Sequence, residues 1–158
     1  MRNPIPTEER FIVIDIDGTL AENSNRQRFL ESNPPDWKSF FSDSEILKDE
    51  PIYPVIDLCR SLITVFRATP VFLTGRPEST RRATLKWLLT YMGNDVVADS
   101  ILFMRPEGNR QSSFVFKQDC VQNIALNQII CCVEDNTKCG LAFKELGLQV
   151  LQVANHDY

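Results

Sequence analysis

Residues 11–20 read FIVIDIDGTL, and this stretch constrains the fold more than any other part of the chain. Four apolar residues run directly into two aspartates that are separated by one isoleucine. A continuous apolar run rich in β-branched residues is typical of a strand buried on both faces of a parallel sheet. Because residues two apart on a strand share a face, we expect Asp15 and Asp17 to project together where the strand ends, and Gly18 permits a sharp turn after them.

Strand-like and helix-like segments alternate along the rest of the chain. Further apolar runs predict strands at residues 69–74, 100–104, 129–133 and 148–153. Apolar stripes at helical spacing lie between them and comprise Ile52, Ile56, Cys59, Ile63 and Phe66; Leu85, Leu88, Leu89 and Met92; Val121, Ile124 and Ala125; and Cys139, Ala142 and Leu146. This alternation predicts an α/β fold, a doubly wound, Rossmann-like, mostly parallel five-stranded sheet with helices on both faces.

The domain organisation follows from the lengths between these segments. We expect residues 1–158 to form a single domain. Residues 21–50 are polar and interrupted by NPPDW, so they are interpreted as a flap or loop-rich insertion. No interval between predicted elements leaves room for a large cap domain.

Composition excludes several classes of protein. Hydrophobic residues make up 43% and charged residues 24% of the chain, as in ordinary globular proteins. The sequence has neither an apolar run of membrane-spanning length nor an N-terminal secretion signal. The five cysteines lack C-x-x-C spacing, which favours small buried residues in a reducing cytoplasm. The net charge of −4 weighs against non-specific nucleic-acid binding but allows a local basic patch. The oligomeric state is left open.

Polar residues follow each predicted strand. They are Asp15, Asp17, Gly18 and Thr19; Thr74, Gly75 and Arg76; Arg105 and then Lys117; and Glu134 and Asp135. In an open α/β sheet, ligands bind beyond the carboxyl ends of the strands, so we expect these residues to converge on one rim.

The chemistry of this rim suits phosphoryl transfer. Three carboxylates favour a hard cation such as Mg²⁺, which relieves the repulsion between a carboxylate and a phosphate and lets the carboxylate attack phosphorus. The Thr74 hydroxyl, the Lys117 ammonium and nearby groups, with Thr19 and Gly75 as candidate substrate contacts, can hold the phosphate oxygens. A second carboxyl can protonate the leaving oxygen, and the spacing of Asp15 and Asp17 suits the two roles.

Four motifs in the expected order resemble those of the haloacid-dehalogenase-like phosphohydrolases. They are DIDGTL, FLTGR, Lys117 and CCVEDN. The resemblance implies that Asp15 is the nucleophile, Asp17 the acid and base, and Thr74 and Lys117 phosphate ligands.

The same resemblance implies a Mg²⁺ site on the Asp15 side chain, the Asp17 carbonyl and the Asp135 side chain. The fourth motif is often two aspartates, whereas here it is Glu134-Asp135. Glu134 is therefore assigned to orient Lys117 or a metal-bound water.

The chain is also similar to the 3′-phosphatase domain of phage polynucleotide kinases. Three features carry this similarity: Arg26, nine residues after the second aspartate; Arg76 in TGR; and the loop at 105–108. The chain's last residues, LQVANHDY, resemble the end of those domains. The similarity implies that Arg26 and Arg76 grip the substrate phosphate or its neighbour. The G-x-x-x-x-G-K-[ST] motif of a kinase is absent from the sequence, so we expect phosphatase chemistry alone.

These observations lead to a Mg²⁺-dependent phosphomonoesterase working through an aspartyl-phosphate, with a nucleic-acid 3′ end as substrate. The alternatives are a small-molecule nucleotidase or sugar phosphatase, and a binding subunit without turnover.

Two surface features are open to two interpretations. Residues 81–86 carry a basic helix face that is solvated or contacts nucleic acid. The aromatic residues Trp37, Phe40 and Phe41 either anchor the flap or stack on a base.

Overall fold

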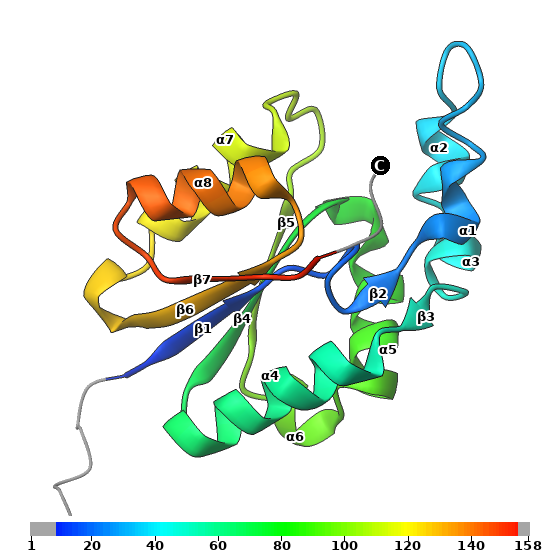
Figure 1. Ribbon diagram of the computed structural model, residues 1–158. Coiled ribbons are helices and arrows are strands. Elements are labelled where there is room, and N and C mark those ends of the chain that lie inside the picture. The colour runs from blue at the N-terminus through cyan, green and yellow to red at the C-terminus, as the bar shows by residue number, and fades with distance from the viewer. Residues whose placement is uncertain (1–8, 155–158) are drawn as a thin grey trace, which may run out of the picture.

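A parallel five-stranded sheet forms the centre of the structure, a computed structural model that describes residues 9–154 (Figure 1). The strand order is β5-β4-β1-β6-β7, and each neighbouring pair is parallel. The strands are β1 (Phe11–Ile14), β4 (Thr69–Pro77), β5 (Ile101–Arg105), β6 (Ile129–Glu134) and β7 (Val150–Gln152). The α/β class and the five-stranded parallel sheet predicted from the sequence are confirmed.

Helices cover both faces of the sheet (Figure 1). On one face lie α4 (Tyr53–Phe66), η1 (Glu78–Thr80), α5 (Arg81–Tyr91) and α6 (Asn94–Val97), and on the other lie α7 (Ser113–Gln122), η2 (Leu126–Gln128) and α8 (Thr137–Glu145). Strand β1 divides its side chains between the two cores: Ile12 and Ile14 pack with α4 and α5, whereas Phe11 and Val13 pack with α7 and α8. Each such buried side chain contributes about 1.5–3 kcal/mol, so this strand is held from both sides.

The path of the chain reverses at β1. From β1 the chain moves to β4 and β5 on one side, and then returns to β6 and β7 on the other. Ligands bind at such a reversal in doubly wound sheets. The residues that follow β1 and β6 therefore occupy the position where this fold offers a binding site.

Some sequence-based boundaries differ from the structure. The edge strands β5 and β7 are partly exposed, so burial on both faces holds for the inner strands only. Leu89 was predicted to belong to the apolar stripe of α5, but it is 42% exposed and is not part of the buried face of this helix. Ile124 and Ala125 follow α7 rather than belonging to it, because this helix ends at Gln122. The buried face of α7 contains Lys117, which weakens the hydrophobic periodicity by which the extent of this helix could have been predicted.

The segment at 21–50 contains short regular elements. They are β2 (Ala21–Glu22), α1 (Ser24–Gln27), α2 (Trp37–Phe40), α3 (Asp43–Ile46) and β3 (Glu50–Pro51), with β2 and β3 paired antiparallel. We call residues 23–49 the flap. It stands beyond the carboxyl ends of the strands, at the right of Figure 1. The indole Nε1 of Trp87 on α5 donates to the carbonyl of Asp49 at 2.8 Å and joins the flap to the helical layer.

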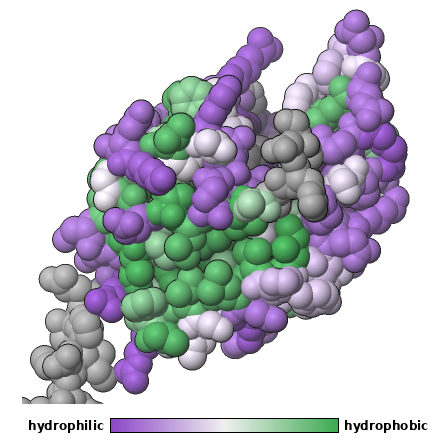
Figure 2. Space-filling model, viewed as in Figure 1, coloured by the Kyte–Doolittle hydropathy of each residue, from purple (hydrophilic) through white to green (hydrophobic). Residues whose placement is uncertain are grey.

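The surface divides into an apolar face and a polar flap. Figure 2 shows apolar residues over the face where α4 and β7 lie in front, and a notch at the top between the flap and the α7 side. Within the described part of the chain, none of the helices has the length and apolar character needed to cross a membrane. Residues 155–158 of the tail resemblance lie outside the described residues.

Candidate active site

Three carboxyl groups meet at the carboxyl ends of β1 and β6. Strand β1 ends directly before Asp15, whose backbone N–H donates to the carbonyl of Val133 on β6 at 3.0 Å. Glu134 and Asp135 follow on β6 and just beyond it. One oxygen from each of Asp15, Glu134 and Asp135 lies within 4.8 Å of the others. We call these three residues the acid cluster.

Lys117 and Thr19 hold the nucleophile candidate from two sides. The Nζ atom of Lys117 donates to Asp15 Oδ1 at 2.6 Å and to Glu134 Oε2 at 2.8 Å. The Thr19 hydroxyl donates to Asp15 Oδ2 at 2.8 Å and lies 3.3 Å from Asp135 Oδ1. The tight turn that places Thr19 here requires Gly18, which has a φ of 81°. Both oxygens of Asp15 are therefore oriented by the fold.

The electrostatics of the acid cluster favour a bound cation. Burial, and then the charge of Glu134, raise the pKa of Asp15 well above its usual value despite the opposing effect of Lys117. Burial likewise raises the pKa of Glu134. One lysine faces three carboxyl groups, so negative charge remains in excess when all of them ionise. Oxygen ligands in this arrangement fit Mg²⁺.

Asp17 lies in a second, separate network with two arginines. Arg26 Nη2 donates to its Oδ1 at 2.6 Å, and Arg76 donates to both carboxylate oxygens at distances between 2.7 and 3.1 Å. Burial alone would raise the pKa of Asp17, but the guanidinium charges of Arg76 and Arg26 outweigh it and lower the pKa to about 2. Asp17 is therefore ionised at neutral pH.

Asp49 completes this network and was not identified from the sequence. Its carboxylate accepts a bidentate pair of hydrogen bonds from Arg26, both at 2.8 Å, and a third from Arg76 at 2.9 Å. Burial raises its pKa to about 6, against the effect of the two arginines. We call Asp17, Arg26, Asp49 and Arg76 the arginine–aspartate network. No local pattern marks Asp49, because its partners are distant in the sequence.

The predicted substrate contacts fall into two groups. Gly75 lines the cavity above the acids, together with Lys117. Arg26, Arg76 and Thr74 do not line it; each is fully buried behind its wall. The Thr74 hydroxyl accepts a hydrogen bond from the backbone N–H of Arg76 at 3.2 Å. In this structure the two arginines hold Asp17, and a direct grip on phosphate stays a prediction.

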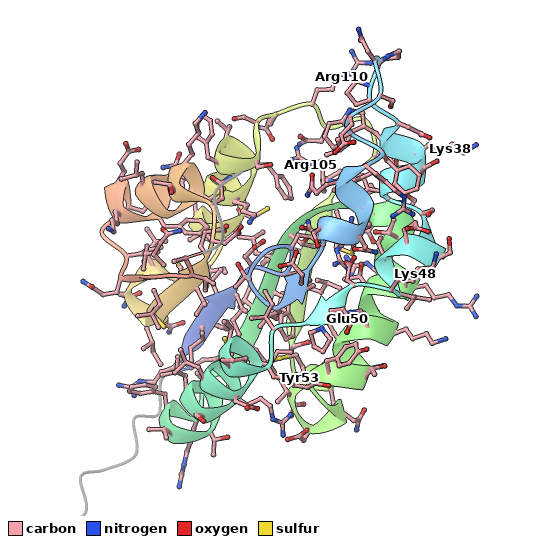
Figure 3. The ribbon with its side chains drawn as sticks, turned by 45° about the vertical axis from the view of Figure 1, so that its right-hand side comes forward. Lys38, Lys48, Glu50, Tyr53, Arg105 and Arg110 are labelled. Carbon is pink, nitrogen blue, oxygen red and sulfur yellow. The ribbon has the colours of Figure 1, made fainter. Side chains whose placement is uncertain are left out.

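A cavity of about 990 Å³ opens above these groups. Its floor carries Asp15, Asp17 and Lys117. One wall is the flap, and the other is the loop that follows β5, where Arg105 and Arg110 are labelled in Figure 3. A cavity of this size accepts a ligand larger than a phosphate ion.

The order of motifs and the geometry agree with one family of enzymes. The family model described as "Polynucleotide kinase PNKP phosphatase domain" matches residues 9–158. The chain belongs to this family. This PNKP-type phosphatase domain is a phosphatase of the haloacid-dehalogenase type, as the resemblance of its motifs predicted. No curated protein matches it in sequence.

Solved structures share the fold at low sequence identity. A chain in "Structure of the Pnkp1/Rnl/Hen1 RNA repair complex" matches with a TM-score of 0.73 and 18% identity, covering 99% of the PNKP-type domain and 46% of that chain. The domain thus spans about half the length of that protein. The class C acid phosphatase from Bacillus anthracis with tungstate bound has a TM-score of 0.61 and 18% identity, over 85% of this chain and 55% of that one. A haloacid dehalogenase-like hydrolase from Streptococcus pneumoniae has a TM-score of 0.59 and 16% identity, and the match covers 92% of this chain and 85% of that one.

Proposed function

We propose that this domain hydrolyses phosphomonoesters through an aspartyl-phosphate on Asp15, and that its substrate is the 3′-phosphate end of a nucleic acid. One observation carries the chemical part. Asp15 lies on the cavity floor with both carboxylate oxygens oriented, one by Lys117 and one by Thr19. A rigidly aimed carboxylate at the end of a buried strand is what in-line attack on phosphorus requires.

Asp17 is proposed as the general acid and base. Its ionised form is the one that takes a proton from the attacking water in the second half of the reaction. Protonation of the leaving oxygen in the first half requires the neutral acid. A phosphate dianion entering beside Asp17 raises the pKa of its carboxyl, because a neighbouring negative charge disfavours ionisation.

The cation proposed for the acid cluster is Mg²⁺. The Asp15 and Asp135 side chains, with the Asp17 carbonyl, are the proposed ligands, and Glu134 is proposed to orient Lys117. Glu134 already accepts from the Lys117 ammonium on one oxygen and from the Asn136 backbone N–H, at 3.0 Å, on the other. When bound, Mg²⁺ would neutralise the repulsion between the carboxylate and the phosphate.

The family match supports a polynucleotide end as substrate. The cavity has the flap and the loop after β5 as its walls, and the described residues contain no second folded domain above it, which supports a substrate as long as a polynucleotide. The acidic net charge of −4 favours the alternative of a small-molecule nucleotidase or sugar phosphatase.

A substrate panel separates the two. We would compare kcat/KM, with Mg²⁺ and with chelator, for a 3′-phosphorylated oligonucleotide, its 5′-phosphorylated counterpart, a nucleoside 3′-monophosphate and a sugar phosphate. The 3′-phosphorylated oligonucleotide should exceed the mononucleotide by at least about tenfold, because neighbouring nucleotides add binding energy. Faster hydrolysis of the mononucleotide or the sugar phosphate would refute the polynucleotide assignment, and Asp15→Asn controls for contaminating phosphatase.

A further inference from the structure

Three aromatic side chains on the flap contact one another beside the active site. The rings of Trp37 and Phe41 are stacked, with centroids 6.0 Å apart and planes at 18°. The Phe40 ring meets both edge-on, at 5.7 and 4.8 Å. Such contacts contribute about 0.5–1.5 kcal/mol each beyond the area they bury. All three residues line the cavity that has Asp15 on its floor.

Burial separates the roles of these rings. Phe40 is 5% exposed and packs over the Arg26 guanidinium, 4.6 Å from its ring centroid. Arg26 also donates to the Phe40 carbonyl, at 3.2 Å. Phe40 therefore anchors the flap. Trp37 is 55% exposed, so anchoring does not account for a tryptophan at this position. Phe41 stacks on the indole of Trp37, and the exposed Trp37 side chain contributes to the lining of the cavity.

The opposite wall of the cavity presents positive charge. Arg105, the last residue of β5, holds the loop that follows: it donates to the Gln111 carbonyl at 2.8 Å and to Asn109 Oδ1 at 3.1 Å, and its guanidinium packs over the Phe116 ring. Arg110, between these two loop residues, is exposed and lines the same cavity. The loop is thus held in shape by Arg105 and carries the charge of Arg110 at the cavity mouth (Figure 3).

We infer that the flap and this loop form a binding site for an unpaired nucleic-acid strand, in which a base next to the terminal phosphate stacks on Trp37 and a phosphodiester contacts Arg110. This inference rests on the proposed function and names the form of its substrate. Aromatic platforms opposite basic side chains are the means by which proteins hold single strands without reading their sequence. A base at a duplex end is paired with the opposite strand and stacked on its inner neighbour, so it reaches Trp37 only at the cost of unpairing and unstacking, which an unpaired base does not incur.

The test compares kinetics of flap variants. Stacking contributes about 1–3 kcal/mol per base, so Trp37→Ala should lower the ratio of kcat/KM for a single-stranded 3′-phosphorylated oligonucleotide to that for glycerol phosphate by at least about fivefold. Trp37→Phe should restore most of this ratio. Tyr53→Ala is the matched control, because Tyr53 is 58% exposed and lies at the far end of the molecule from Arg110 (Figure 3). An unchanged ratio in Trp37→Ala, or an equal loss in Tyr53→Ala, would overturn the inference.

Arg110 is tested by the salt dependence of KM. Arg110→Ala should raise KM for the oligonucleotide and make its dependence on salt less steep, because one phosphate contact is lost. Lys38→Ala is the control, since Lys38 is also exposed but points away from the cavity (Figure 3). A salt dependence that stays as steep in Arg110→Ala as in the wild type would exclude this contact.

Tryptophan fluorescence tests base stacking on Trp37 without requiring turnover. The chain has two tryptophans, Trp37 and Trp87, and Trp87 is 1% exposed. In the Asp15→Asn protein, the single-stranded oligonucleotide should quench the emission of Trp37, and additional Trp37→Phe should remove the quenching. A blunt duplex with the same phosphate should quench less. If the wild type hydrolyses only mononucleotides, the proposed function fails. If the single strand does not quench the emission, the stacking of a base on Trp37 is refuted, whichever substrates the enzyme hydrolyses.

Discussion

Replacing Arg26 tests whether the arginine–aspartate network stabilises the fold by balancing buried charge. In the wild type, two guanidinium groups face two carboxylates, and the side chains of Arg26, Arg76 and Asp49 are 0% exposed. Arg26→Met fills a similar volume but leaves one arginine between Asp17 and Asp49. Breaking a buried pair in this way costs about 3–5 kcal/mol. For a chain of this size, the melting temperature should fall by about 10 °C.

The pH dependence of this loss follows from Asp49. Its folded pKa of about 6 lies above the ordinary value of 3.8, so its contribution to stability falls as the pH rises toward 6 in the wild type. Removing Arg26 takes away a positive charge that lowers this pKa and moves it higher still. Between pH 6 and 8 the variant should continue to lose stability, by about 1.4 kcal/mol for each further pKa unit, whereas this contribution is constant in the wild type.

Two control variants make the measurement specific. Arg26→Lys keeps the charge but loses the bidentate geometry, so its deficit should be smaller and independent of pH between 6 and 8. Arg28→Met removes an arginine that is 54% exposed and pairs with Glu45, and should cost at most about 1 kcal/mol. The assay is urea unfolding followed by circular dichroism from pH 5.5 to 8.5. A deficit of Arg26→Met that does not change with pH, or an Arg28→Met protein equally destabilised, would refute the charge-balance argument.

Three further predictions concern the nucleophile, the cation site and a pair of glycines, Gly75 at the cavity and Gly93 at the start of α6. Asp15→Asn should reduce hydrolysis of p-nitrophenyl phosphate by at least about a thousandfold while circular dichroism stays unchanged, and a rate within tenfold of the wild type would exclude Asp15 as nucleophile. Chelator should abolish activity, and Mg²⁺ at 100 times its Kd should stabilise the protein by about 2.7 kcal/mol in thermal unfolding. Because burial raises the pKa of Asp15, the affinity for Mg²⁺ should increase as the pH rises. An affinity that does not change with pH would contradict the assignment of Asp15 as a Mg²⁺ ligand. Gly75→Ala should retain activity and stability, since its Cβ would meet only Arg105 and Ser113 atoms at 3.8 Å. Gly93→Ala should lower the free energy of unfolding by about 1–2 kcal/mol, because Gly93 has a φ of 87° and side-chain atoms stand 2.6 and 2.8 Å from the added Cβ; equal stability of the two variants would contradict this reasoning.

The flap aromatics show where the sequence left two interpretations open. It permitted an anchor or a stacking platform; the structure shows one ring buried as an anchor, and stacking on a base stays a proposal. Phe40 packs over Arg26, whereas Trp37 is exposed to the cavity. Which ring is buried and which is exposed depends on how α2 packs within the flap. A run of aromatic residues in a sequence does not reveal that packing.

The acids at strand ends could be predicted because they are local. A β-branched run defines strand β1, the two-residue period puts Asp15 and Asp17 on one side, and the carboxyl ends of parallel strands share an edge. These rules need only neighbouring residues and the order of elements. They place Glu134 and Asp135 beside Asp15 without information on how the side chains pack.

Only the tertiary structure decided how the charges pair. The family resemblance implied that Asp17 is the acid and base and that Arg26 and Arg76 grip the substrate phosphate or its neighbour. In the fold, Asp17 pairs with Arg76 across 59 residues, and Arg26 pairs with Asp49 across 23. Lys117 reaches Asp15 across 102 residues from a helix whose buried face it interrupts. Buried ionic groups pair with whichever opposite charge the packing brings within about 3 Å, because leaving them unpaired costs several kcal/mol. Short-range patterns carry no information about that distance, so the sequence determined which groups surround the site and the fold determined their partners.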